Sequence, residues 1–430
     1  MARKMKDSGI EWIGEIPEGW EIVPVRSCFD EVRTKNTDGQ EQNALQFKSG
    51  NIISKTNFNA SMDDYVADTI TNYTVVLPDT VMINGLNLNY DFKSLRVALV
   101  KEKGVITSAY LAIFPDRKKI SPQYATYLFK GYETKMAFHN MGAGIRKTLG
   151  YKEFKNQPLL LPSEKEQNKI SVYLDSKCSH IDIMLSKIRS SIEEYKKFKQ
   201  AVITQAVTKG VRGERERKDS GVDWIGKIPK EWVIQKIKSI SSRINVGVVI
   251  RPSEYFDENG TVPFLRGINV KEYLISSDNM VYINESSNRI LSKSQVHTDD
   301  ILIVRDGSIG TSCVVPAEFD GANVVSMVIA TPSISCDSRF ICYSLNSDVG
   351  KTQFTLTKIG SALTHTSVSA VSDIIVAVPS CAEQKEIADY LDAKCAEIDK
   401  LIAKKEQLVK ELESYKKSLI YEVVTGKREV

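Results

Sequence analysis

Apolar residues recur at alternating intervals of three and four positions along two long stretches of the chain, one after Pro162 and one after Pro379. This spacing places them in a narrow stripe on one face of a helix, as in a coiled coil. The residues predicted to form the seam between the helices are Leu174, Ile181, Leu185, Ile188 and Ile192 in the first stretch, and Leu391, Ile398, Ile402, Val409 and Leu412 in the second.

The two stretches begin in the same way. Ser163 and Ser380 each follow a proline and precede a glutamate, Glu166 or Glu383, by three residues. This spacing predicts a capping box at each helix start. Each helix would run for roughly 45 residues, or about 68 Å. Core packing inside one domain is the alternative for a shorter helix, but two equal long stripes favour an intramolecular coiled coil.

The helices belong to a larger repetition. Residues 6 to 17 return with few changes as residues 218 to 229, and Trp20 is matched by Trp232. Such self-similarity indicates two half-molecules, each with a constant frame around a variable insert. If the halves are related by a pseudo-twofold axis, the two helices pack antiparallel.

The two inserts share little residue-by-residue identity. Both contain short apolar runs between polar connections, which predict strands, and the first also contains a helical pattern. The runs cover residues 75–77, 81–83 and 97–100, with the helix over 121–137, in the first insert, and 262–266, 301–305 and 313–316 in the second. We therefore expect one mixed α/β module, used twice with a changed surface.

These patterns predict an α+β fold with two mixed α/β domains joined by two long helices in an antiparallel coiled coil. The expected divisions are residues 1–157 for the first domain, 158–212 for the first helix, 213–378 for the second domain and 379–430 for the second helix.

Charge and cysteine content narrow the function only slightly. The chain has 430 residues, with 58 basic and 54 acidic side chains and a net charge of +4. This balance permits a nucleic-acid partner without requiring one. Seven cysteines without a CxxC pair fit reduced thiols in the cytoplasm better than disulfides or a zinc cluster. No apolar stretch has the length that a membrane span needs, so we expect no membrane partner.

Loops rich in Asn, Ser, Arg and Gly stand out in both inserts. These residue types hydrogen bond to base edges and phosphates, although any one loop alone is more typical of an ordinary turn. The predicted DNA-contacting residues are Asn84, Asn87, Asn89, Arg146 and Lys147 in the first insert, and Arg266, Asn269, Arg305, Ser308 and His365 in the second.

An enzyme requires catalytic groups, and the motifs for them are missing. The sequence has no phosphate-binding GxxxxGK, no Gly-rich cofactor loop before a helix and no metal-ligand spacing among its histidines. The best nuclease candidates are Asp116 with Glu153 and Lys155, but their spacing is loose and the second insert has no counterpart. We expect no catalytic residue and no metal site in this chain. A pure protein-interaction scaffold without DNA contact stays as a second hypothesis.

The repeated frame resembles the specificity subunit of type I restriction-modification systems along essentially the whole chain. The most specific marks are the entry segment from Asp7 to Pro17 with Trp20, its duplicate from Asp219 to Pro229, and the Pro-x-x-x-x-Glu-Gln start of each long helix. The segment from Asp300 to Gly310 also looks like the family's second recognition domain, whereas Asp79 to Gly85 departs from that pattern.

The resemblance implies two target recognition domains, each reading one half of a bipartite sequence in double-stranded DNA. It implies that the coiled coil sets the gap between the halves and docks two methyltransferase subunits, with restriction and translocase subunits completing the complex. S-adenosylmethionine, ATP and Mg²⁺ would be bound by those partners, and this chain would carry no cofactor.

Overall fold

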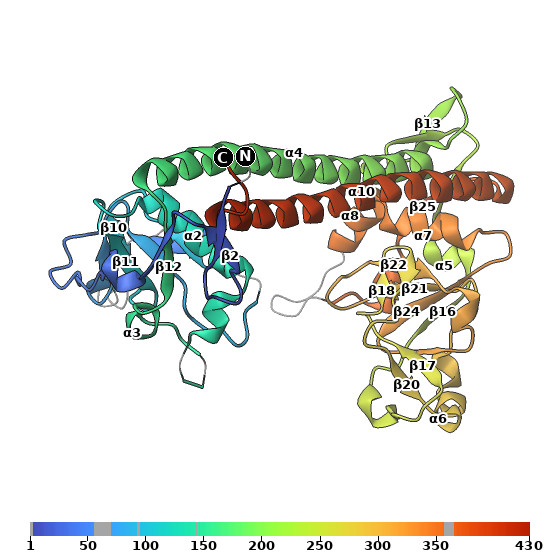
Figure 1. Ribbon diagram of the computed structural model, residues 1–430. Helices are drawn as coiled ribbons and strands as arrows, with labels where there is room; N and C mark the ends of the chain where they lie inside the picture. The colour runs from blue at the N-terminus through green and yellow to red at the C-terminus, as the bar shows by residue number, and fades with distance from the viewer. Residues whose placement is uncertain (1–2, 56–69, 93–94, 143, 146, 357–364) are drawn as a thin grey trace. The chain divides into compact units, whose positions relative to one another are not determined.

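The structure is a computed structural model that describes residues 3–55, 70–92, 95–142, 144–145, 147–356 and 365–430. The chain divides into two compact units (Figure 1). Unit 1 comprises Met1–Arg189 and Gln407–Val430, and unit 2 comprises Ser190–Glu406. Both divisions fall inside long helices, so each unit contains part of both. The unit limits therefore differ from the domain limits expected from the sequence.

The two long helices are α4 (Glu164–Lys209) and α10 (Cys381–Val424). Lys416 of α10 pairs with Asp182 of α4 in unit 1, and Lys199 of α4 pairs with Asp399 of α10 in unit 2. Within each unit, residues later in α4 lie beside residues earlier in α10, so the helices pack antiparallel (Figure 1).

The predicted seam residues lie on the inner side of this helix pair. Six are buried: Leu174, Ile181, Leu185, Ile192, Leu391 and Ile398. Ile188, Ile402, Val409 and Leu412 are half-buried. The narrow apolar stripe thus forms the contact between the two helices. Parts of both helices also pack into the hydrophobic core of each unit.

Each unit contains a four-stranded antiparallel sheet with the same strand order. In unit 1 the order is β4 (Phe29–Glu31), β11 (Leu111–Pro115), β8 (Val81–Ile83) and β9 (Val97–Leu99). In unit 2 it is β16 (Ser241–Val246), β24 (Met327–Pro332), β21 (Ile301–Val304) and β22 (Ser312–Val314). The inserts are therefore one module used twice, as the apolar runs predicted.

The apolar side chains of the central strands point alternately to the two faces of the sheet and pack into a hydrophobic cluster on each face. Val81 and Ile83 face the cluster that includes the long helices, and Met82 faces a second cluster on the opposite side of the sheet. Ile301 and Leu302 divide in the same way in unit 2. With the side chains of a strand alternating between faces, both faces of each sheet are buried.

The remaining elements also occur in corresponding places. Hairpins β1–β2 and β13–β14 are the repeated entry segments, and the pairs β3–β12 and β15–β25 lead into the long helices. Their bounds are β1 (Met5–Asp7), β2 (Glu15–Pro17), β13 (Arg217–Asp219), β14 (Lys227–Pro229), β3 (Glu21–Pro24), β12 (Pro158–Leu161), β15 (Val233–Lys236) and β25 (Ile375–Val378). Gly14 and Gly226 have φ of 72° and 69°, a conformation that explains why the repeat keeps glycine there.

Shorter helices cover the sheets, and smaller sheets flank them. The helices are α2 (Pro122–Thr134), α3 (Tyr151–Phe154), α5 (Ile237–Ile240), α6 (Glu285–Ile290), α7 (Ser338–Asn346), α8 (Asp348–Leu356) and α9 (Val368–Ser372). The flanking strands are β5 (Leu45–Lys48), β6 (Asn51–Ser54), β7 (Thr74–Val76), β10 (Gly104–Ile106), β17 (Val262–Leu265), β18 (Val270–Lys271), β19 (Leu274–Ile275), β20 (Val281–Ile283) and β23 (Asn323–Val324).

Candidate functional site

The predicted polar loops follow the central strands β8 and β21 at the same end of the two sheets. Strand pairing aligns Val81 with Ile301, and the preceding Asp79 and Asp299 both have positive φ, 74° and 69°. Asp79 therefore corresponds to Asp299, one position earlier than the comparison with Asp300 had suggested. Gly85 consequently takes the place of Arg305.

A returning segment holds each loop in the same way. The amide of Leu149 donates to Gly85 O at 2.9 Å, and the amide of Thr366 donates to Arg305 O at 3.1 Å. A short helix, α3 or α9, begins directly after each of these residues. The fold thus brings together, in each unit, two loops that are far apart in the sequence.

In unit 1, Asn84, Asn87, Asn89 and Lys147 are gathered at this end of the sheet. Asn84 uses its side-chain oxygen to accept the amide of Leu86. Asn89 Nδ2 donates to the carbonyl of Ile145, which links the two loops. Asn87 and Lys147 are exposed, and both have positive φ. Arg146 lies outside the described residues.

Arg96 supports the first loop, although the sequence analysis did not select it. Its side chain is 1% exposed, and its guanidinium donates to the carbonyls of Asn84, Leu86 and Asp91 at 2.9, 2.8 and 2.6 Å. The signal in the sequence was a single arginine inside an otherwise apolar run. A lone arginine is more typical of an exposed position, so only the fold reveals this role.

Glu133 on α2 forms a hydrogen bond with the backbone of Arg96. Its carboxylate accepts the amide of Arg96 at 2.6 Å. Burial raises the pKa of Glu133 to about 7, against the lowering effects of the hydrogen bond and the charge of Arg96. Desolvation therefore outweighs the favourable contacts at this carboxyl.

In unit 2 the predicted residues take different roles. Asn269 is fully buried: its side-chain oxygen accepts the amide of Arg266, and its nitrogen donates to the carbonyls of Ser276 and Asp278. These bonds use the amide to build the turn after β17, so Asn269 has a structural role and is removed from the set of proposed base contacts. Arg266 is half-buried and donates to the carbonyl of Asn279.

Arg305, Ser308 and His365 form the more open part of this end of the sheet. Arg305 is half-buried, with Nε donating to the carbonyl of Thr366 at 3.0 Å. Ser308 and His365 are exposed, and residue 365 forms a β-bridge with Asp306. The carboxylate of Asp306 accepts the Ser326 hydroxyl at 3.1 Å.

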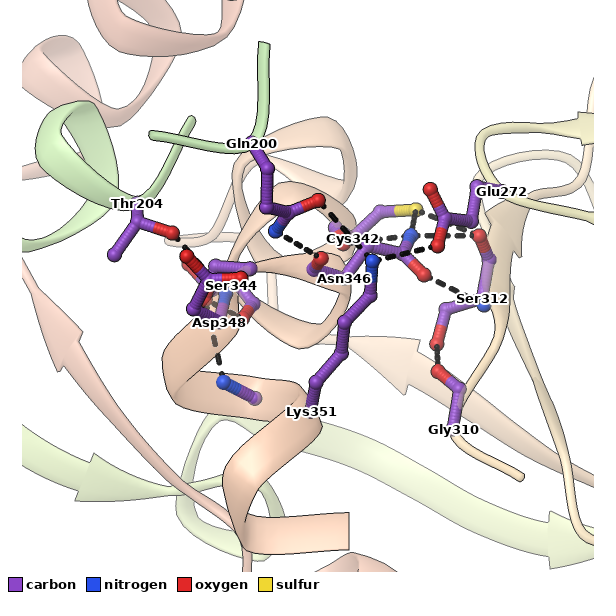
Figure 2. A network of polar contacts seen from close by, with 12 residues as sticks. Gln200, Thr204, Glu272, Gly310, Ser312, Cys342, Ser344, Asn346, Asp348 and Lys351 are labelled. Atoms are coloured by element: carbon purple, nitrogen blue, oxygen red, sulfur yellow. Dashed lines mark hydrogen bonds and ion pairs between the residues drawn. The ribbon is translucent and has the colours of Figure 1, made fainter. Parts of the chain in front are cut away.

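A buried polar network attaches the second loop to the long helix (Figure 2). The side chain of Asn346, at the end of α7, accepts the amide of Ser312 and donates to its carbonyl. The carbonyl of Asn346 accepts Gln200 Nε2 of α4 at 2.9 Å, and Thr204 of α4 accepts the amide of Asp348. The loop before β22 is thereby held in position relative to the part of α4 within unit 2.

The repeated frame residues join each long helix to its entry hairpin. Glu166 accepts Trp20 Nε1 at 2.9 Å and pairs with Arg3, whose guanidinium lies 5.4 Å from the Trp20 ring. In unit 2, Glu383 pairs with Arg215 at 2.5 Å, and Arg215 lies 5.4 Å from the Trp232 ring. The capping-box prediction was half wrong: the serine accepts the N3 amide, but each glutamate reaches the hairpin instead of the helix start.

The glutamine after each glutamate fastens the next helix. Gln167 accepts the amide of Ser121, the N-cap residue of α2, at 2.8 Å. Gln384 accepts the amide of Asp337, the N-cap residue of α7, at 2.9 Å. The repeated Glu-Gln pair thus connects each long helix with the rest of its unit.

Asp116 and Glu153, which the sequence offered as nuclease candidates, make separate contacts and do not share a site. Asp116 pairs with Lys119 and accepts the amide of Lys118, a contact that lowers the pKa of Asp116, whereas Glu153 accepts the amide of Gly150. Among the residues that the structure describes, no cluster of three or more His, Cys, Asp or Glu side chains could hold a metal ion. In the same described ranges, no helix is both long and apolar enough to cross a membrane.

Known proteins are similar to this chain in sequence and in fold. Residues 229–411 match the type I restriction modification DNA specificity domain. The type I restriction enzyme MjaVIII specificity subunit of Methanocaldococcus jannaschii is 24% identical over 418 residues, which cover 96% of this chain and 93% of that protein.

Two solved structures share the fold. A chain from a study of complex assembly and conformational transition of the type I R-M system superposes with a TM-score of 0.72 at 14% identity, covering 96% of this chain and 99% of that chain. The HsdS subunit from Thermoanaerobacter tengcongensis gives a TM-score of 0.50 at 14% identity, covering 96% and 98%.

Two mixed α/β modules on a pair of long helices, with a repeated frame, make up the fold that this chain shares with these solved structures. The chain is thus similar in sequence and in fold to type I restriction-modification specificity subunits.

Proposed function

We propose that this chain is the DNA-reading subunit of a type I restriction-modification complex and recognises a bipartite sequence in duplex DNA. The observation that carries the proposal is the equivalence of the two sheet ends. The same strand order and the same returning segment support loops that differ in sequence and length. A constant support with changed side chains suits two readers of different half-sites.

The side chains available at each end fit this role. Asn87 and Lys147 in unit 1, and Ser308 and His365 in unit 2, are exposed, while Arg305 and Arg266 are half-buried beside them. Asparagine and arginine can form paired hydrogen bonds with adenine and guanine edges, and lysine contacts phosphate. We assign base reading to Asn87, Ser308, His365 and Arg305, and contact with the phosphate backbone to Lys147.

Docking of two methyltransferase subunits on the long helices is supported by a repeated surface. Phe198 and Tyr415 each come one residue before the lysine of a matched interhelical ion pair, and they are 51% and 50% exposed. Tyr173 and Tyr390 form a second matched pair on the same helices, half-buried and exposed respectively. Aromatic side chains at repeated exposed positions suit two copies of one partner.

In this proposal the chain itself is not catalytic. Methylation, ATP-driven translocation and cleavage belong to the methyltransferase and restriction subunits, which would bind S-adenosylmethionine, ATP and Mg²⁺. The coiled coil would set the gap between the half-sites, and the complex would act in the cytoplasm, where the cysteines of this chain stay reduced.

Selection from randomised duplex DNA tests the function, with the chain co-purified with its methyltransferase partner. We expect two short, unlike motifs at a fixed separation, and binding that weakens steeply with added salt because phosphate contacts release counterions. Recovery of no motif from an assembled complex would overturn the proposal and favour an interaction scaffold.

A further inference from the structure

The loop after β8 is folded around one buried side chain. Arg96 donates to three carbonyls of residues 84–91, the segment that carries Asn84, Asn87 and Asn89. Its guanidinium also lies 3.6 Å from the carboxylate of Asp91. Carbonyls turned toward the protein interior must be hydrogen bonded, and a guanidinium with its five donors can serve several at once.

Arg96 is itself held at both backbone groups. Its amide donates to Glu133 of α2 at 2.6 Å, and its carbonyl accepts the amide of Asn84 at 2.8 Å. Glu133 lies on α2, and the N-cap residue of α2, Ser121, is hydrogen bonded to Gln167 of α4. The loop is therefore connected to the long helix through α2. The loop conformation is therefore fixed relative to unit 1.

Unit 2 closes the corresponding loop without a buried arginine. Thr311 takes the place of Arg96, because Ser312 pairs with Ile303 as Val97 pairs with Ile83. The loop is shorter, and backbone bonds close it: Val304 donates to Thr311 O and Gly310 donates to Val304 O, both at 3.0 Å. A buried arginine thus accompanies the longer of the two loops.

We propose that Arg96 is a positioning residue for the reading of the first half-site. It sets the conformation in which residues 84–91 present Asn87 and the exposed ring of Tyr90, and it does not contact DNA. This inference rests on the proposed function, because it assigns base reading to that loop. It predicts that specificity at one half-site depends on a side chain buried beneath the surface.

The test compares Arg96→Lys and Arg96→Gln with the unchanged chain, each as the full chain with its methyltransferase partner. Arg96 reaches the three carbonyls from two nitrogens, whereas lysine carries all its donors on one nitrogen and glutamine has only two donors. We expect discrimination at the first half-site to fall roughly ten-fold or more, the scale of one lost base contact. Discrimination at the second half-site and affinity for unrelated DNA should stay unchanged, which a general loss of folding would not allow.

Arg117→Lys is the matched control. Arg117 pairs with Asp79 at 2.6 Å at the opposite end of the same sheet, so its replacement should leave both half-sites unchanged. A folded Arg96 variant that recovers the unchanged motif would overturn the inference.

Amide exchange of the unchanged protein gives a test that needs no variant. If Arg96 holds the loop, the amides of Leu88 and Asp91 exchange slowly, since both also donate within the two loops. Exchange of residues 84–91 at the rate of an unstructured peptide would contradict the inference. Selection with the unchanged chain tests the proposed function, which is wrong if no motif is recovered. Selection with the variants tests only the role of Arg96, which is wrong if the motif is unchanged.

Discussion

At the scale of single residues, the side chains kept in both copies are those that join elements, and those that differ surround the loops. Glu166 and Gln167 connect α4 with Trp20 of the entry segment and with α2. Glu383, through its ion pair with Arg215, and Gln384 make the corresponding connections in unit 2. Arg96, by contrast, has Thr311 in its place. Local contact geometry therefore explains which residues the repeat keeps.

Asn346 offers the clearest test of a buried polar contact. Replacing it with alanine removes the side-chain acceptor of the buried Ser312 amide, whereas the Ser312 carbonyl keeps the amide of Tyr273 and the thiol of Cys342 as donors. We expect unit 2 to lose about 1 to 3 kcal/mol of unfolding free energy, measured by urea denaturation. Lys351→Ala removes a half-exposed ion pair with Glu272 in the same network and should cost less than about 1 kcal/mol. Equal losses would contradict the assigned role of Asn346.

Glu133 predicts a pH dependence with a definite sign. Its pKa of about 7 in the folded protein lies above the unfolded value of about 4.3, so the native state binds more protons between these values. Stability contributed by this group is therefore lost as pH rises through that window. Glu133→Gln keeps an oxygen acceptor for the Arg96 amide and removes the titration.

We expect the stability difference between the Glu133→Gln variant and the unchanged protein to shift in favour of the variant by about 1 to 3 kcal/mol from pH 4 to pH 8. Urea denaturation at several pH values measures it, and other titrating groups cancel in the comparison. A difference that does not change with pH would show that Glu133 ionises normally.

At the scale of elements, the lysines that interrupt the heptad stripes have an interhelical role. Lys199 and Lys416 reach Asp399 and Asp182 on the opposite helix, so the same ion pair occurs once in each unit. Lys405 lies 5.4 Å from the ring of Tyr195. Such polar contacts favour one register over neighbouring ones, because a shift of the helices would separate the charges.

Two isoleucines on α4 test the direction of the stripe. Ile181 is buried in the seam, whereas Ile183 is 50% exposed on the outer side of the same helix. Ile181→Ala should lower the unfolding free energy of unit 1 by about 2 to 4 kcal/mol through lost burial and a cavity. Ile183→Ala should change it by less than about 0.5 kcal/mol. Similar losses of unfolding free energy in the two variants would contradict the burial of Ile181 and the exposure of Ile183 on this part of α4.

At the scale of the whole molecule, the two units are expected to read independently. Arg305→Ala should relax the base preference of the half-site read by unit 2 and leave the other half unchanged. Lys147→Ala should weaken binding to all sequences by similar factors and lower the salt dependence by about one phosphate contact. Selection and salt titration of each variant, and of the double variant, measure these effects. A loss of both half-site preferences in Arg305→Ala would contradict independent reading.

The sequence alone determined the repeat, the two long helices and the seam positions, because heptad spacing and self-similarity are local or periodic signals. It also located both polar loops after the strands. Only the tertiary structure decided which side chains in them are free: Asn269 is buried in its own turn, while Asn87 and Ser308 are exposed. Hydrogen bonding between distant segments makes that choice, and no local pattern records it. The roles of Arg96 and Asn346 remained hidden for the same reason, since their partners lie on other elements of the fold.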